Sequence, residues 1–138
     1  MAIRVVQPIA LVLALMAGDA MADVVVVVSA KSPLAKLDKA AVTDLYLGAT
    51  KEAPGLGQAT LVALAPPVRD EFYAKVLGKE ASQVKAIWSR LIFSGKGIAP
   101  KELTSAAEVK ALLAGNPNAI GYVDKADVDA SVKVVFAP

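Results

Sequence analysis

Residues 24–28 read VVVVV, and this run of five valines does the most to decide the fold of the chain. Five β-branched residues without polar alternation predict a strand that is buried on both faces, which is typical of a parallel sheet under helices. Apolar runs at 60–64, 119–123 and 132–136 predict three further strands. Helical patterns separate the strands, so we expect an α/β fold with a mostly parallel sheet flanked by helices.

The segments between the strands carry apolar residues at helical spacing, with recognisable start signals. Asp38 is placed to cap a helix over 39–47, and Ser82 is placed to cap the helix that carries the strongest apolar stripe. Ser105, followed three residues later by Glu108, predicts a capping box at the start of the last helix. These helices interleave with the strands along the chain.

The amino-terminal residues predict an exported protein. Arg4 is followed by the apolar run PIALVLALMA over 8–17, and the small-residue triplet AMA ends at Ala22. This order is that of a secretory signal peptide, and such a short run does not span a hydrocarbon core of about 30 Å. We expect residues 1–22 to be a signal peptide cleaved after Ala22, with an uncleaved anchor as the alternative. Residues 23–138 are then one periplasmic domain without a membrane span.

Composition narrows the function. The chain has no histidine and no cysteine, and its net charge is +2. These absences exclude serine–histidine catalysis, a thiolate nucleophile and the commonest zinc ligands. No carboxylate pair lies in an apolar stretch that would shift its pKa, and the weak positive charge does not argue for nucleic acid. We therefore expect a protein that is not an enzyme, that uses no metal or cofactor and that binds no nucleic acid.

Four blocks of the sequence point to a family. They are LYLGAT at 45–50, VRDEF at 68–72, Trp88 with the FSG turn at 93–95, and NPNAIGYV at 116–123. In this order and spacing they resemble the periplasmic phosphate-binding proteins of ABC transporters, which have the type II solute-binding fold. The resemblance extends over essentially all of residues 23–138 but covers one lobe of a two-lobed family. It implies an exported solute-binding-like protein that binds phosphate or a related oxyanion for an ABC transport system.

One departure from the family pattern supports a different function. Where the family holds its oxyanion with a Ser-Gly-Thr step, this chain has Pro66, Pro67 and Val68. Proline has no N–H to donate and valine has no hydroxyl. A single lobe also leaves a ligand half hydrated in an open groove. The alternative is a non-catalytic periplasmic interaction module that keeps the fold, has lost ligand binding and binds an envelope or transporter protein.

Five residues are candidates for an anion site. Arg69 lies in the first turn of the helix that would face the anion in the family. Ser29 and Lys31 follow the valine strand at its carboxyl end, where open α/β sheets bind ligands. Ser94 and Lys96, flanked by glycines, have the composition of an anion nest. The plainer interpretations are a solvated residue paired with its acidic neighbours, a polar loop and a helix stop.

Overall fold

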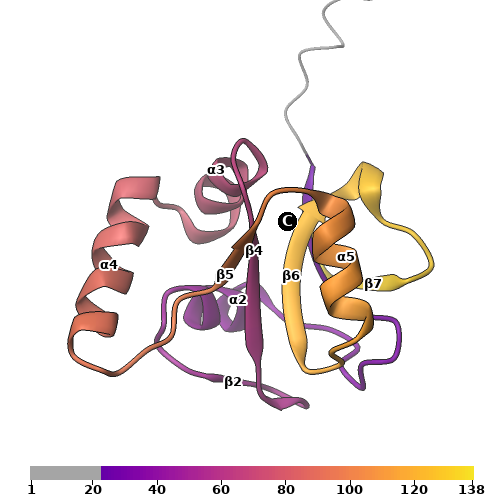
Figure 1. The fold of residues 1–138 in the computed structure, drawn as a ribbon, viewed down its shortest axis with the longest axis horizontal. Helices are drawn as coiled ribbons and strands as arrows, with labels where there is room; N and C mark the ends of the chain where they lie inside the picture. The colour runs from indigo at the N-terminus through magenta and orange to yellow at the C-terminus, as the bar shows by residue number, and fades with distance from the viewer. Residues whose placement is uncertain (1–22) are drawn as a thin grey trace, which may run out of the picture.

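The computed structural model describes residues 23–138, and the expected signal peptide lies outside the described residues (Figure 1). A five-stranded sheet runs in the order β5-β4-β6-β1-β7. Its strands are β1 (Val24–Ser29), β4 (Thr60–Leu64), β5 (Lys101–Leu103), β6 (Ala119–Asp124) and β7 (Val132–Phe136). Two short strands, β2 (Glu52–Ala53) and β3 (Gly57–Gln58), form a separate hairpin.

Helices cover both faces of the sheet and one of its edges (Figure 1). They are α2 (Lys39–Tyr46), α3 (Val68–Phe72), α4 (Ala81–Phe93) and α5 (Ala106–Ala114), with a π-helical turn at Tyr73–Leu77 and a 3₁₀ turn at Lys125–Asp127. Helix α5 packs on one face of the sheet, α2 and α3 pack on the other, and α4 stands beside the β5 edge. Within residues 23–138, no helix combines the length and apolar character that a membrane crossing requires.

The α/β fold class is confirmed, and the sheet is mixed. β4 runs parallel to β5 and to β6, whereas β1 runs antiparallel to β6 and to β7. The valine run lies on an inner strand, and each of its side chains is at most 3% exposed. A fully apolar run reports burial on both faces, which the helices provide here. It does not report the direction of the neighbouring strands, because burial of a side chain does not depend on that direction.

Two of the expected helix caps are present and one is wrong. Asp38 and Ser105 each accept a hydrogen bond from the backbone N–H three residues on, at 2.8 and 3.2 Å. The other half of the capping box expected at Ser105 differs, because the Glu108 carboxylate accepts the Thr104 N–H at 3.0 Å. The cap expected at Ser82 is wrong, because α4 begins at Ala81 and its cap is Glu80, two residues before Ser82. Glu80 and Gln83 close a reciprocal box there, in which the Glu80 N–H donates to the Gln83 side chain at 2.9 Å. The preference for a serine cap is a statistical one, and here two longer polar side chains satisfy the N–H groups of Glu80 and Gln83 at the start of the helix.

The four family-like blocks meet in the core. Phe72 stacks on Tyr122 with ring centroids 4.0 Å apart, and Tyr46 meets the Phe72 ring edge-on at 4.9 Å. The indole N–H of Trp88 donates to the Tyr46 carbonyl at 2.8 Å. All four side chains are buried. The blocks that carry the resemblance therefore build the packing between α2, α3, α4 and β6.

Two tyrosine hydroxyls hold β4 in place. β4 pairs with β6 only over its first two residues. Beyond this point the Tyr46 hydroxyl lies 2.8 Å from the Val62 carbonyl and 3.0 Å from the Ile120 carbonyl, and Tyr122 donates to Leu64 at 3.2 Å. Burial raises the pKa of both tyrosines, so both hydroxyls stay protonated as donors. The carboxyl end of β4, from which the candidate site is built, is thereby positioned.

Candidate functional site

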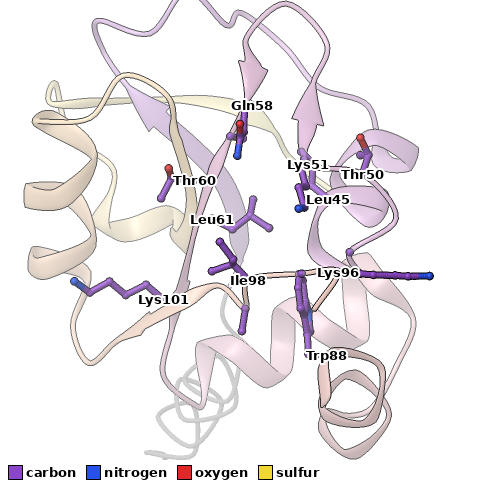
Figure 2. Close-up of a pocket in the computed structure, with 14 residues that line it drawn as sticks. Leu45, Thr50, Lys51, Gln58, Thr60, Leu61, Trp88, Lys96, Ile98 and Lys101 are labelled. Atoms are coloured by element: carbon purple, nitrogen blue, oxygen red, sulfur yellow. The ribbon is translucent and has the colours of Figure 1, made fainter. Parts of the chain in front are cut away.

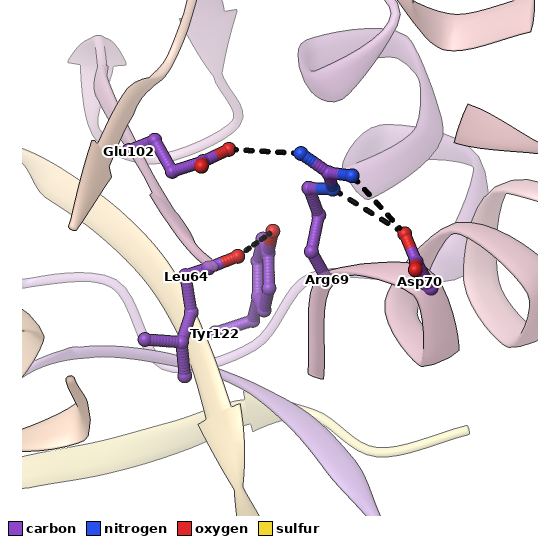
Figure 3. A network of polar contacts seen from close by, with 5 residues as sticks. All are labelled: Leu64, Arg69, Asp70, Glu102 and Tyr122. Carbon is purple, nitrogen blue, oxygen red and sulfur yellow. Dashed lines mark hydrogen bonds and ion pairs between the residues drawn. The ribbon is translucent and has the colours of Figure 1, made fainter. Parts of the chain in front are cut away.

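The carboxyl end of β4 leads through Pro66 and Pro67 into α3, and Arg69 lies in the first turn of that helix. Figure 3 shows the Arg69 guanidinium between two carboxylates. Its Nη1 donates to Glu102 Oε1 at 3.2 Å, and its Nε and Nη2 both donate to Asp70 Oδ1 at 3.3 Å. The guanidinium carbon also lies 5.6 Å from the centroid of the Tyr73 ring. The strongest candidate from the sequence therefore already has partners within the chain.

The charges around Arg69 favour its protonated form and hold its guanidinium in contact with Glu102 and Asp70. Partial burial lowers the pKa of Arg69, but the hydrogen bond to Glu102, the nearby Tyr73 and the contact with Asp70 outweigh it and raise the pKa overall. The Arg69 side chain is 25% exposed and lines a groove of about 390 Å³ with Lys85 and Glu102. A dissolved anion would have to compete with both carboxylates for the guanidinium.

The backbone at the start of α3 offers few donors. Pro66 and Pro67 have no N–H. The N–H of Arg69 donates to the Ala65 carbonyl at 3.4 Å, and that of Glu71 donates to the Pro67 carbonyl at 3.2 Å. These bonds close the first turn of the helix on itself. The substitution noted in the sequence thus removes donors that the local geometry does not replace.

The structure does not bring Ser29 and Lys31 to Arg69. Because β1 runs antiparallel to β4 in the sheet, the last residue of β1 and the last residue of β4 lie at opposite ends of the strands. Ser29 is 1% exposed, and its Oγ accepts the Lys31 N–H at 3.1 Å. Lys31 is exposed on the turn that follows. These two residues cannot form one site with Arg69.

Ser94 and Lys96 lie at the far end of α4. The first residues of this helix line the Arg69 groove, and its 13 residues span about 20 Å. The Ser94 hydroxyl and the Lys96 N–H both donate to the Leu91 carbonyl, at 3.1 and 2.8 Å. These contacts are those of a helix stop, and an anion nest at these residues stays a prediction.

Lys96 instead borders a second pocket, of about 260 Å³, at the amino end of β4 (Figure 2). Its apolar lining includes Leu45, Leu61, Trp88 and Ile98, and its lysines are Lys51, Lys96 and Lys101. Sequence reasoning missed two of these lysines because they are far apart along the chain. The absence of any Asp or Glu between residues 81 and 101 was an available signal for Lys101, whereas no local signal marks Lys51, which is followed by Glu52. No group of three or more potential metal ligands occurs within the described range 23–138.

Comparison with known proteins gives matches among solved structures. No family model and no curated protein matches the chain. A putative phosphate ABC transporter substrate-binding protein from Clostridium perfringens, solved with bound phosphate, is 19% identical, with a TM-score of 0.63 over 83% of this chain and 44% of that one. PstS from Borrelia burgdorferi is 9% identical, with a TM-score of 0.61 over 83% and 46%.

An ABC-type phosphate transport receptor from Vibrio cholerae is 18% identical, with a TM-score of 0.54 over 83% of this chain and 45% of its own. The chain thus spans less than half the length of each of these three proteins. They are binding proteins and not enzymes, and at these identities the likeness establishes the fold. The chain has the α/β fold of the phosphate ABC transporter substrate-binding proteins, in a version that corresponds to a single lobe.

Proposed function

We propose that this protein is an exported, non-catalytic binding module that uses a phosphate-receptor lobe to bind a protein of the cell envelope or of a transport system. The observation that carries the proposal is the state of Arg69, which is held by Glu102 and Asp70. Pro66 and Pro67 remove the donors beside it. A lobe with this start of α3 keeps its fold but is poorly suited to hold an anion alone.

The energetics favour a macromolecular ligand over a free ion. An anion in an open groove keeps part of its hydration shell, so each new hydrogen bond contributes only about 0.5–3 kcal/mol net. At Arg69 that gain is reduced further, because an existing carboxylate contact must be lost first. A protein partner buries a larger area and does not depend on one guanidinium.

Titration of the protein with phosphate, sulfate and arsenate tests this function. The protein is expressed from the 138-residue sequence, and all titrations are made by calorimetry at one ionic strength because anion binding is screened by salt. We expect no measurable heat with millimolar ligand. Micromolar binding of any of these anions that is lost in Arg69→Ala would overturn the proposal.

Binding of phosphate or a related oxyanion for an ABC transport system is the second candidate. It is favoured by the partly exposed Arg69 side chain, which faces the same groove as Lys85. The result of the titration separates the two functions. A binding site that requires both Arg69 and Lys85 would make oxyanion capture the function of this lobe.

Export is part of the proposal. The charge, apolar run and small-residue triplet of residues 1–22 predict cleavage after Ala22 and a periplasmic location. The intact mass of protein purified from the producing cell should correspond to a chain that starts at Asp23. A full-length species retained in the membrane fraction would contradict it.

A further inference from the structure

The carboxyl-terminal end of α4 and the turn after it expose large apolar side chains. Phe93 is 94% exposed, Ile98 is 83% exposed and Ile92 is 50% exposed. The helix is fastened to the protein by Val84 and Trp88, which are its buried residues. Apolar side chains gathered on one exposed segment are characteristic of interaction surfaces.

The same segment is strongly and uniformly basic. Residues 81–101 contain Lys85, Arg90, Lys96 and Lys101 and no Asp or Glu, whereas the whole chain has a net charge of +2. Within the part of the chain that the structure describes, none of these four cations takes part in an ion pair. We call the exposed part of residues 85–101 the α4 surface.

A concave site borders the α4 surface. The pocket of about 260 Å³ has Leu61, Trp88 and Ile98 in its apolar lining. Lys96 and Lys101 extend outward on opposite sides of it (Figure 2). This pocket lies at the amino end of β4, and the Arg69 groove lies at the carboxyl end, with Trp88 and Ala99 lining both. An apolar floor with a basic rim is complementary to an apolar side chain flanked by carboxylates.

We propose that the α4 surface docks an acidic segment of a protein partner, which inserts an apolar side chain into this pocket. The proposal rests on the proposed function and names the surface and the class of partner. A second copy of this chain is a poor occupant, because two surfaces with the same uncompensated positive charge repel each other. A flat lipid surface would leave the concave pocket unfilled, so an acidic protein segment fits better.

Selection of random displayed peptides on the protein, expressed from the 138-residue sequence, tests the proposal. We expect the enriched peptides to carry Asp or Glu on both sides of an apolar residue. Their affinity should fall by about tenfold or more in Phe93→Ser/Ile98→Ser and in Lys96→Glu, and it should fall as salt is added. The matched controls are Val134→Ser, an exposed valine on β7, and Lys125→Glu, an exposed lysine of the 3₁₀ turn.

The folding of each variant is measured by its melting temperature. If the double variant does not fold, Lys96→Glu carries the test, since that side chain is exposed. Peptides without acidic bias, or binding that the variants leave unchanged, would overturn the surface assignment while leaving the interaction module intact. Two other results would also overturn the proposal. Binding to phosphatidylglycerol vesicles that is lost in the same variants would identify a membrane as the occupant of this surface. Dimerisation in solution that is lost in these variants would identify a second copy of the chain. Failure of the proposed function is read separately, from micromolar anion binding that requires Arg69.

Discussion

At the carboxyl end of β4 the charge of Arg69 is matched by two carboxylates, whereas the four cations of the α4 surface have no acidic partner in the described chain. Both regions border grooves of a few hundred Å³. Both also contain basic side chains, so the number of positive charges alone does not distinguish them. The difference lies in what already surrounds each cation. A guanidinium with partners stabilises the lobe, while unpaired lysines beside exposed apolar side chains are available to bind something else.

The sheet supports both regions, so its disruption should have the largest effect. Val26 is fully buried on the inner strand β1, and Val26→Asp places an unpaired carboxylate there at a cost of several kcal/mol. Against a typical total stability of about 5–15 kcal/mol, this should prevent folding. The control is Val134→Asp, which makes the same change at a side chain that is 40% exposed. Cooperative melting of Val26→Asp near the wild-type temperature, followed by circular dichroism, would contradict the buried placement.

Trp88 lies between the two regions, because it lines both cavities and is one of the two buried residues of α4. Trp88→Phe removes the 2.8 Å bond to the Tyr46 carbonyl and part of a buried ring. We expect a loss of about 1–3 kcal/mol in urea denaturation, together with faster hydrogen exchange in α4 than in β4. Ile92→Ala, on an exposed side chain of the same helix, should change stability by no more than about 0.5 kcal/mol. Equal effects of the two substitutions would show that Trp88 does not anchor α4.

Glu102→Gln tests whether the partners of Arg69 are what distinguishes it from the cations of the α4 surface, because it removes one of the two carboxylates at the guanidinium. The substitution removes one charge from the guanidinium 3.2 Å away and keeps the side-chain size. We expect the affinity for phosphate, which in the unmodified protein is too weak to give heat at millimolar ligand, to rise by about two- to fivefold, which corresponds to roughly 0.5–1 kcal/mol for an exposed ion pair. The shift of the Glu71 amide resonance, in the same first turn of α3, measures this gain during a titration with phosphate at concentrations above millimolar. The gain should disappear in Arg69→Ala/Glu102→Gln, and its persistence there would place the anion elsewhere.

The ion pair between Lys110 and Asp129, away from both regions, should have the smallest effect on stability. The Lys110 ammonium donates to Asp129 at 2.8 Å, and this bond, together with those from Ser131, holds the pKa of the Asp129 carboxyl well below its usual range. A carboxyl with a lowered pKa in the folded state stabilises that state at pH values above its unfolded pKa of about 4, and the contribution is lost as the pH falls below that. Melting temperatures measured from neutral to acidic pH should therefore fall less in Asp129→Asn. An equal fall in both proteins would contradict this assignment.

Local patterns were sufficient for much of the architecture. The valine run predicted a strand buried on both faces, and Asp38 and Ser105 predicted the starts of two helices. Short β5 escaped detection because three residues beginning with Lys101 and Glu102 carry no apolar alternation and depend on pairing with β4. The four family-like blocks pointed to the right fold because they pack against one another in its core, which is a property of the fold and not of a ligand.

The arrangement of the candidate site required the folded chain. Periodicity and capping act over a few residues, so the sequence contains them directly. Strand direction and long-range partners do not follow from local pattern. The antiparallel placement of β1 moved Ser29 away from Arg69, and β5 brought Glu102, 33 residues along the chain, to the guanidinium. The lysines of the α4 surface gather in the same way, because a charge acquires its partners, or fails to, only when the sheet and helices have packed.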